Sequence, residues 1–328
     1  MQAPEFFTKA VRRPLKAKLI FNPSSGRAGE SPQQLVDILS AMQAQNILAE
    51  VSMVHPDCQI ETLAQGALKA GIKLVVVAGG DGTIDSVAGA LIGTEATLGI
   101  IPTGTRNNLA LNLGIPNKIA EAVALLRNGH RRKVDVGMIQ RGHTWRWFLE
   151  AATVGLLSDI YPVADNIQHG DLSQIGELVS TFFSANPSKL KLTLDGRKHI
   201  NSTSHMVLVA NMAFIGPHFR ISPKVSFKDR RLDVFVFSEM SKLNLVSYVM
   251  QALSGPVERE DIRHYRVRQL KIHGTPMMPV LADGVPMGQG DTTVAIRPHA
   301  LNIMAGTTYV GSSIEEQPLS VEPELVRG

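Results

Sequence analysis

A carboxylate interrupts a glycine turn that otherwise has the composition of a phosphate-binding loop. Residues 75–89 read VVVAGGDGTIDSVAG, a pattern typical of an apolar strand, a tight turn and the start of a helix. Glycines let the backbone approach a phosphate closely, and the amides that open the next helix point toward it. Because Asp81 would repel a bare polyphosphate, its presence indicates a divalent cation or a hydroxyl that gives up a proton. The alternative is an ordinary helix-capping role.

Two other loops carry polar groups suited to the same ligand. Residues 22–26, NPSSG, offer a side-chain amide, two hydroxyls and a glycine backbone. Residues 102–108, PTGTRNN, offer two further hydroxyls, a cation and two amides. Each loop alone is consistent with an ordinary polar turn. Together the three loops favour a nucleotide site, provided that the fold brings them to one place.

The strands and helices expected around these three loops predict that the loops lie close together. Residues 16–137 repeat the order apolar strand, small-residue loop, helix, which is typical of a parallel sheet with helices on both faces. In these folds ligands gather at the carboxyl ends of the strands, where all three loops lie. Residues 138–311 are rich in short β-type segments with Asp-Gly turns at 195–196 and 283–284, which favours an antiparallel β-sandwich or barrel. Residues 312–328 are expected to form a flexible tail.

The totals exclude several other kinds of protein. The chain has 328 residues and is 44% hydrophobic, which suffices for two ordinary globular domains. Its one cysteine, Cys58, excludes an internal disulfide and a cysteine-based metal cluster. No apolar run has the length of a signal peptide core or a membrane span, so we expect a cytoplasmic protein. Aromatic residues make up only 5% of the chain and do not alternate with basic ones, which argues against a nucleic-acid partner.

NPSSG, GGDGT and PTGTRNNLA, in this order, resemble the motifs of the diacylglycerol kinase catalytic domain family. This family includes bacterial lipid kinases, sphingosine kinases and ceramide kinases. GGDGT alone is shared with NAD kinases, whereas PTGTRNNLALNLGIP is similar to the lipid-kinase stretch only. The resemblance implies an NAD kinase-like or diacylglycerol kinase-like α/β domain followed by a β-sandwich domain. It also implies an ATP-dependent lipid kinase that uses Mg²⁺ and acts on a diacylglycerol-like or sphingoid lipid at a membrane surface. A homodimer is possible.

The resemblance carries site residues over by position. Asp81 would lie beside the phosphates and the catalytic magnesium. A hydroxyl near the end of the second strand often contributes in the family, and Ser52 is the candidate here. The implied ATP-binding residues are Asn22, Pro23, Ser24, Ser25, Gly26, Ser52, Gly80, Asp81, Gly82, Thr83, Ile84, Asp85, Ser86, Thr105 and Asn107.

A second magnesium position is implied by the stretch SFKDRRLDVFVF. The family often has Asp-Gly-Leu-Leu-Asp here, and the matching carboxylates are Asp229 and Asp233, with backbone oxygens of Ser226 and Arg231 as further ligands. Arg230 and Arg231 replace the usual small and apolar residues, so like-charge repulsion should weaken binding of a divalent ion. The alternative is a β-turn closed by Asp229 and Arg230.

One position departs from the family in a way that bears on catalysis. The family's Asp-Gly-Glu turn, whose glutamate is thought to accept the proton of the lipid hydroxyl, reads Asp283-Gly284-Val285 here. Valine cannot accept a proton, and a positioned general base contributes about 10²–10⁴-fold. Asp283 or Asp81 could serve as the base instead, although Asp283 is also a natural first residue of a hairpin turn. A catalytically degenerate protein that binds nucleotide or lipid is therefore the alternative, and a soluble-substrate kinase such as an NAD kinase is a third, weaker one.

Overall fold

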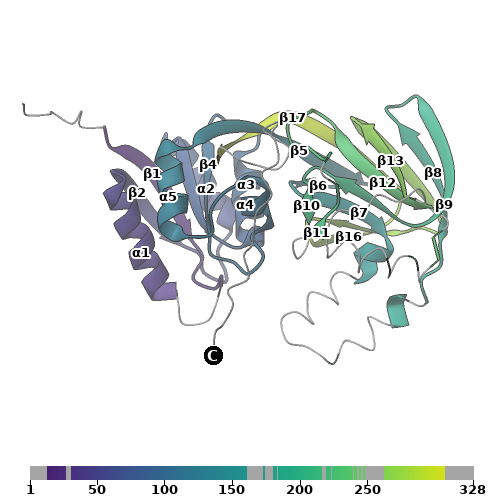
Figure 1. Cartoon of the computed structure of the whole chain (residues 1–328), viewed down its shortest axis with the longest axis horizontal. Helices are drawn as coiled ribbons and strands as arrows, with labels where there is room; N and C mark the ends of the chain where they lie inside the picture. Colours follow the sequence, from purple (N-terminus) through teal and green to yellow (C-terminus); the bar gives the residue numbers. More distant parts are fainter. Residues whose placement is uncertain are drawn as a thin grey trace, which may run out of the picture.

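Two lobes lie side by side in the structure, a computed structural model (Figure 1). One lobe combines helices and strands, and the other consists mainly of strands. The structure describes residues 13–26, 31–160, 173, 180–182, 184–215, 219–222, 224–238, 240–241, 244, 247 and 262–306. The expected flexible tail, residues 312–328, lies outside the described residues.

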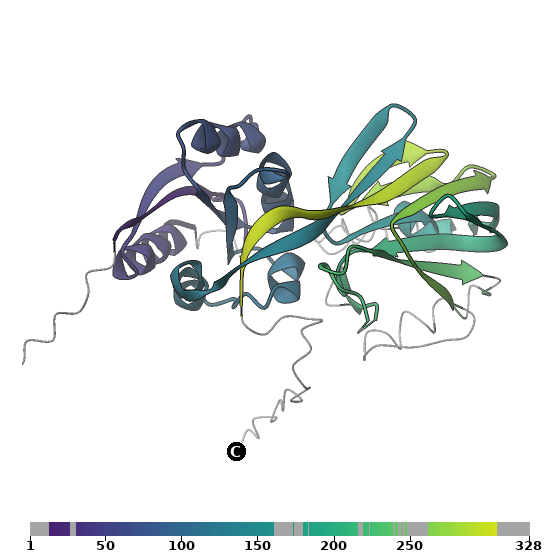
Figure 2. The ribbon, with the colours of Figure 1, turned by 90° about the horizontal axis from the view of Figure 1, so that it is seen from above.

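The first lobe is a parallel sheet with helices on both faces (Figure 2). Its strands lie in the order β2, β1, β3, β4, and β17 is the next strand beyond β4. Every residue of β3 is buried, as expected for a strand covered on both sides. Helix α1 packs against α5, and α2 packs against α3. The elements of this lobe are β1 (Leu15–Phe21), α1 (Ser31–Ala44), β2 (Ile47–Met53), α2 (Ile60–Lys69), β3 (Leu74–Gly79), α3 (Asp81–Leu91), β4 (Thr97–Pro102), α4 (Asn108–Asn112) and α5 (Ile119–Asn128).

The second lobe is antiparallel, with a separate apolar core. In β8 buried and less buried residues alternate, the pattern of a strand with one face in the core. Both Asp-Gly pairs form hairpin turns with positive φ, Asp195-Gly196 between β8 and β9 and Asp283-Gly284 between β15 and β16. The strands are β5 (His130–Arg141), β6 (Thr144–Phe148), β7 (Ala151–Gly155), β8 (Ser188–Leu194), β9 (Lys198–Ala210), β10 (Phe214–Ile215), β11 (Phe219–Arg220), β12 (Leu232–Ser238), β13 (Ile262–Val267), β14 (Gln269–Thr275), β15 (Pro279–Ala282), β16 (Val285–Gln289) and β17 (Thr292–Ala305).

Strands β5 and β17 run through both lobes and join them (Figures 1 and 2). The start of β17 pairs with β14 of the second lobe, whereas Asn302 near its end pairs in parallel with Thr97 of β4. The two long strands pair with each other along most of their length. The predicted fold class is confirmed, and the expected boundary between residues 137 and 138 falls inside β5. In the described part of the chain, no helix has the length and apolar content to cross a membrane.

Candidate active site

The three polar loops meet at one edge of the parallel sheet. They follow β1, β3 and β4, which are neighbours in the sheet. The amide of Asn22 donates to the carbonyl of Ala78 at 2.9 Å, and the amide of Thr103 donates to the carbonyl of Gly79 at 3.2 Å. Each loop therefore begins hydrogen-bonded to its neighbour, as the strand order predicts.

Side chains then tie the loops together. The amide nitrogen Nδ2 of Asn22 donates to Oγ1 of Thr83 at 2.7 Å, which joins the first loop to α3. The hydroxyls of Ser25 and Thr103 lie 2.9 Å apart, which joins the first loop to the third. The side-chain oxygen of Asn22 also accepts the amide of Ser24 at 2.9 Å, so this residue holds its own loop in shape.

Two glycines permit backbone contact between loops. A Cβ atom on Gly104 would lie 2.5 Å from the Cα of Gly80, well inside van der Waals contact. Gly26 has a φ of +85°, and a Cβ there would lie 2.5 Å from the carbonyl oxygen of Thr103. Glycine is required at these positions because larger residues would push the loops apart.

The predicted ATP-binding residues divide into those that hold the loops together and those that remain open. Thr83 is 6% exposed and Ile84 is fully buried, and both amides donate to the carbonyl of Gly80. The side chain of Asn107 makes two hydrogen bonds to the backbone of Gly104. Ser52 lies on β2, beside β1 and away from the loops of β3 and β4. Apart from Ser52, the predicted residues that are exposed or half-buried are Asn22, Pro23, Ser24, Ser25, Gly26, Gly80, Asp81, Gly82, Asp85, Ser86, Thr105 and Asn107.

Asp81 begins helix α3 directly after the glycine turn. Its Oδ1 atom accepts the amide of Leu109 at 3.4 Å, which connects the helix to α4. Burial raises the pKa of Asp81, while backbone amides of α4 and the nearby charge of Arg106 act in the opposite direction. A partly buried carboxylate at a helix N-terminus, among loops rich in donors, is suited to hold a cation beside phosphates.

Asp85, one turn further along α3, faces the second lobe instead of the loops. It forms an ion pair with Arg146 of β6. Burial raises the pKa of Asp85, and the guanidinium of Arg146 lowers it. Asn112 makes a second connection, because its side chain exchanges hydrogen bonds of 2.9 and 3.0 Å with the backbone of Phe214. These polar contacts fix α3 and α4 against the second lobe.

The carboxylate of Asp283 is hydrogen-bonded to backbone amides, which leaves it little capacity to accept a proton during phosphoryl transfer. Its two carboxylate oxygens accept the amides of Leu149, Glu150 and Ala151, the last two at 3.0 and 2.9 Å. Its φ of +43° is that of a turn residue. Burial and the charge of Asp85 raise its pKa to about 7, against the effect of the three amides. The geometry therefore favours the turn role over the role of base.

Glu150 is a site residue that the sequence reasoning missed. It lies between β6 and β7, and its Oε2 atom accepts Nδ2 of Asn108 at 3.3 Å. Burial raises its pKa well above the usual value, and the charges of Asp283 and Asp81 add to this effect. A signal was present, since FLEAATVG places one charged residue inside an apolar run. Its partners, however, lie 42 and 133 residues away along the chain.

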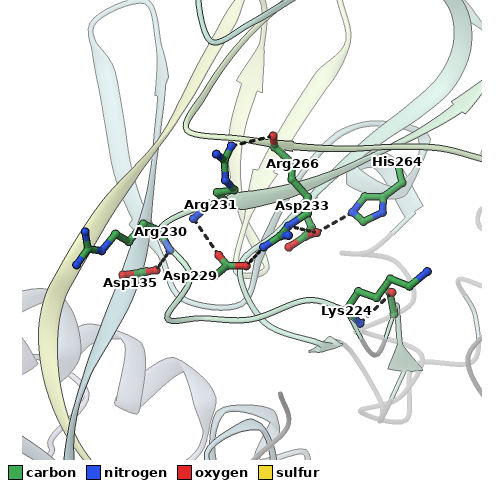
Figure 3. Close-up of polar contacts among 9 residues, drawn as sticks. Asp135, Lys224, Asp229, Arg230, Arg231, Asp233, His264 and Arg266 are labelled. Atoms are coloured by element: carbon green, nitrogen blue, oxygen red, sulfur yellow. Dashed lines mark hydrogen bonds and ion pairs between the residues drawn. The ribbon is translucent and has the colours of Figure 1, made fainter. Parts of the chain in front are cut away.

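The predicted second metal loop contains cations of the protein itself (Figure 3). Arg266 of β13 forms an ion pair with Asp229, and its Nε lies 3.8 Å from Oδ1 of Asp233. Nε2 of His264 lies 2.7 Å from the same oxygen of Asp233. Asp229 also accepts the amide of Arg231 at 3.0 Å.

This arrangement does not fit a structural magnesium ion. Mg²⁺ requires about six oxygen ligands, whereas the carboxylates of Asp229 and Asp233 face a guanidinium. Burial raises the pKa of Asp233, while the bond from His264 lowers it. No group of three or more acidic, histidine or cysteine side chains in the described part of the chain could hold a metal. The prediction of a metal site with Ser226, Asp229 and Arg231 is therefore not supported by this geometry.

Comparisons with known proteins agree with the fold. Residues 16–139 match the family model of the diacylglycerol kinase catalytic domain, and residues 161–305 match that of the YegS C-terminal NAD kinase beta sandwich-like domain. The chain is 26% identical over 278 residues to the diacylglycerol kinase of Bacillus subtilis, which covers 82% of this chain and 89% of that protein. It is 25% identical over 253 residues to a probable lipid kinase YegS-like of Chromohalobacter salexigens, covering 74% and 79% of the two chains.

A solved structure gives the same result. The crystal structure of a Bacillus anthracis protein, described provisionally as a diacylglycerol kinase, superposes with a TM-score of 0.74 at 25% identity. The match covers 89% of this chain and 98% of that one. The two matched models account for both lobes. Residues 16–139 thus belong to the diacylglycerol kinase catalytic domain family, and residues 161–305 belong to the YegS C-terminal domain family.

Proposed function

We propose that this protein is an ATP-dependent lipid kinase. It transfers the γ-phosphate of ATP to a hydroxyl group of a diacylglycerol-like or sphingoid lipid, and it acts in the cytoplasm during transient contact with a membrane surface. The observation that carries the proposal is the meeting of three polar loops around Asp81 at one edge of the parallel sheet. The family membership supports the same reaction class.

The loops supply groups suited to a triphosphate. The hydroxyls of Ser24 and Thr105 lie on exposed residues of the loops and are suited to phosphate oxygens, and the start of α3 adds a favourable helix dipole. Asp81 is the residue that would hold Mg²⁺, which prefers one or two carboxylates together with phosphate oxygens. When bound, Mg²⁺ offsets the charge of the β- and γ-phosphates. In this reaction positioning and charge neutralisation carry most of the catalysis.

One observation favours a second candidate, a degenerate family member that only binds nucleotide or lipid. Val285 stands where the family's glutamate is expected, so no carboxylate comes from that position. Val285 is 39% exposed. A kinase for a soluble substrate is the third candidate. The stretch PTGTRNNLALNLGIP argues against it, since it is similar to the lipid kinases.

A transfer assay separates the candidates. The protein is incubated with γ-labelled ATP and mixed micelles of diacylglycerol, sphingosine or ceramide, and with NAD in a parallel reaction. We expect label in one lipid class, and loss of that label in Asp81→Asn. Intact ATP binding without transfer to any lipid would favour the degenerate binder, and label in NAD would favour the third candidate. Light scattering on the same sample tests whether the protein forms a homodimer.

A further inference from the structure

A carboxylate lies beside the turn from which the expected glutamate is missing. The turn Asp283-Gly284 is bound to the segment 149–151, because Asp283 accepts all three amides of that segment. Val285 pairs with Ala282, and Ala282 pairs with Ala152, two residues after Glu150. Two strand spacings, about 10 Å, therefore separate Val285 from the strand that follows Glu150.

The carboxylate of Glu150 is also attached to the phosphate loops. Its Oε2 atom accepts Nδ2 of Asn108 at 3.3 Å, while Oδ1 of Asp81 accepts the amide of Leu109 at 3.4 Å. Two consecutive residues at the start of α4 thus hold the carboxylates of both lobes near each other. Asn108 is 3% exposed, and its side-chain oxygen is buried without a hydrogen-bond partner. A buried amide oxygen of this kind is satisfied by an ordered water or by a hydrogen-bond donor of a ligand.

The other acidic groups here are already engaged. Asp283 accepts three amides, and Asp85 is paired with Arg146. Asp81 begins α3 beside the glycine turn, where the phosphates and their cation are expected. Among the described residues, the side chain of Glu150 makes a single hydrogen bond, of 3.3 Å, and so it keeps the capacity to accept a proton.

We propose that Glu150 is the catalytic base of this kinase, replacing from the segment between β6 and β7 the glutamate that is absent at Val285. The inference rests on the proposed function. As the acceptor hydroxyl oxygen forms its bond to the γ-phosphorus, the bond from that phosphorus to the β,γ-bridging oxygen breaks, and ADP leaves. The hydroxyl proton passes to Glu150 and then to solvent. Burial and the neighbouring carboxylates, which raise the pKa of Glu150, make it a stronger base than an exposed glutamate.

A carboxylate swap tests this assignment. Glu150→Gln keeps the shape of the side chain and removes the base, so we expect kcat to fall about 10²–10⁴-fold while ATP affinity, measured by direct binding, is unchanged. The double variant Glu150→Gln/Val285→Glu returns a carboxylate from the other strand, and we expect it to regain at least about ten-fold over the single variant. Glu121→Gln, which removes an exposed glutamate of α5, is the matched control and should retain full activity.

Each outcome decides a different point. If the wild type phosphorylates no lipid, the proposed function fails, and the assignment of a base fails with it. If the wild type is active and Glu150→Gln keeps more than about a tenth of kcat, only the assignment of Glu150 is overturned. A loss of ATP affinity in Glu150→Gln would place Glu150 at the nucleotide and also overturn its role as base. If Glu150→Gln unfolds, Glu150→Asp is measured instead, alone and combined with Val285→Glu. The exchange of carboxylates is overturned if these two variants have the same kcat and that kcat equals the wild-type value.

Discussion

Arg266 provides a direct test of whether a guanidinium has taken the place of a metal ion. We expect Arg266→Ala to lower the free energy of unfolding and, unlike the wild type, to gain stability from Mg²⁺ bound at its loop. The substitution leaves Asp229 and Asp233 without their shared cation, and the side chain of Asp233 is fully buried. Among the described residues, His264 then remains to offset the charge of Asp233.

The magnitude follows from burial. Removing one partner of a fully buried pair costs about 3–5 kcal/mol. The side chain of Arg266 is 47% exposed, so water screens much of this interaction. We therefore expect a loss of about 1–2 kcal/mol in the free energy of unfolding, in the range of a charge-assisted hydrogen bond. If the freed carboxylates bind Mg²⁺ at ten times its Kd, mass action returns about 1.4 kcal/mol.

Thermal and urea unfolding, each with and without millimolar Mg²⁺, measure both effects. Arg263→Ala is the matched control, because it removes an exposed arginine from the same strand, outside the metal loop. Asp229→Asn separates this loop from any other magnesium site. The reasoning is refuted if Mg²⁺ stabilises the wild type and that stabilisation disappears in Asp229→Asn, since the loop would then hold a metal despite Arg266.

Three further predictions concern the active site. Gly104→Ala should weaken ATP binding by at least about ten-fold, because overpacking of about 1–3 kcal/mol separates two loops. The control Gly89→Ala adds a methyl group in open space on α3 and should raise Tm. Equal ATP affinities of the two variants in calorimetry would contradict the prediction for Gly104. Asn112→Ala should lower the free energy of unfolding by about 2 kcal/mol in urea, since it removes both hydrogen bonds between the Asn112 side chain and the backbone of Phe214, and an unchanged midpoint would count against it. The ligand-free protein should lose stability as pH rises from about 4 to 7. Burial raises the pKa of Asp283 to about 7 and that of Glu150 well above normal, so the folded state binds more protons than the unfolded one there. Glu150→Gln should reduce this loss relative to Glu121→Gln, and parallel pH profiles of the two variants would refute it.

The sequence was sufficient for features set by local chemistry. An apolar strand followed by a glycine turn predicted the end of β3, and Asp-Gly predicted the turns at 195 and 283. The parallel arrangement of β1, β3 and β4 followed from repeated strand–loop–helix units, and it correctly predicted that their loops meet. These inferences depend on residues within about ten positions of one another, where backbone preference decides the structure.

Features made by distant pairing could not be predicted in the same way. Residues of β17 return to the first lobe and pair with β4, and no periodicity in either strand indicates this. The partner of Asp229 is Arg266, 37 residues further along the chain and on another strand. Residues this far apart meet only through the sheet register, which the local pattern does not specify.

The two departures from the family therefore have a common physical interpretation. In the sequence, Val285 replaces a residue with a carboxylate, and Arg230 and Arg231 add positive charge to a loop that is expected to bind a metal. In the structure, a carboxyl group lies near the first position on Glu150, and a positive charge lies at the second on Arg266. A site requires charge at a point in space and not at a position in the sequence, so a neighbouring strand can supply it. If another residue has taken over the lost group at both places, removing that substitute residue alone should impair the protein. Restoring the family's residue should impair the protein only when the substitute residue is still present. Non-additive effects of Glu150→Gln with Val285→Glu, and of Arg266→Ala with Asp229→Asn, would distinguish a site whose lost group is supplied by another residue from a site that has lost its function.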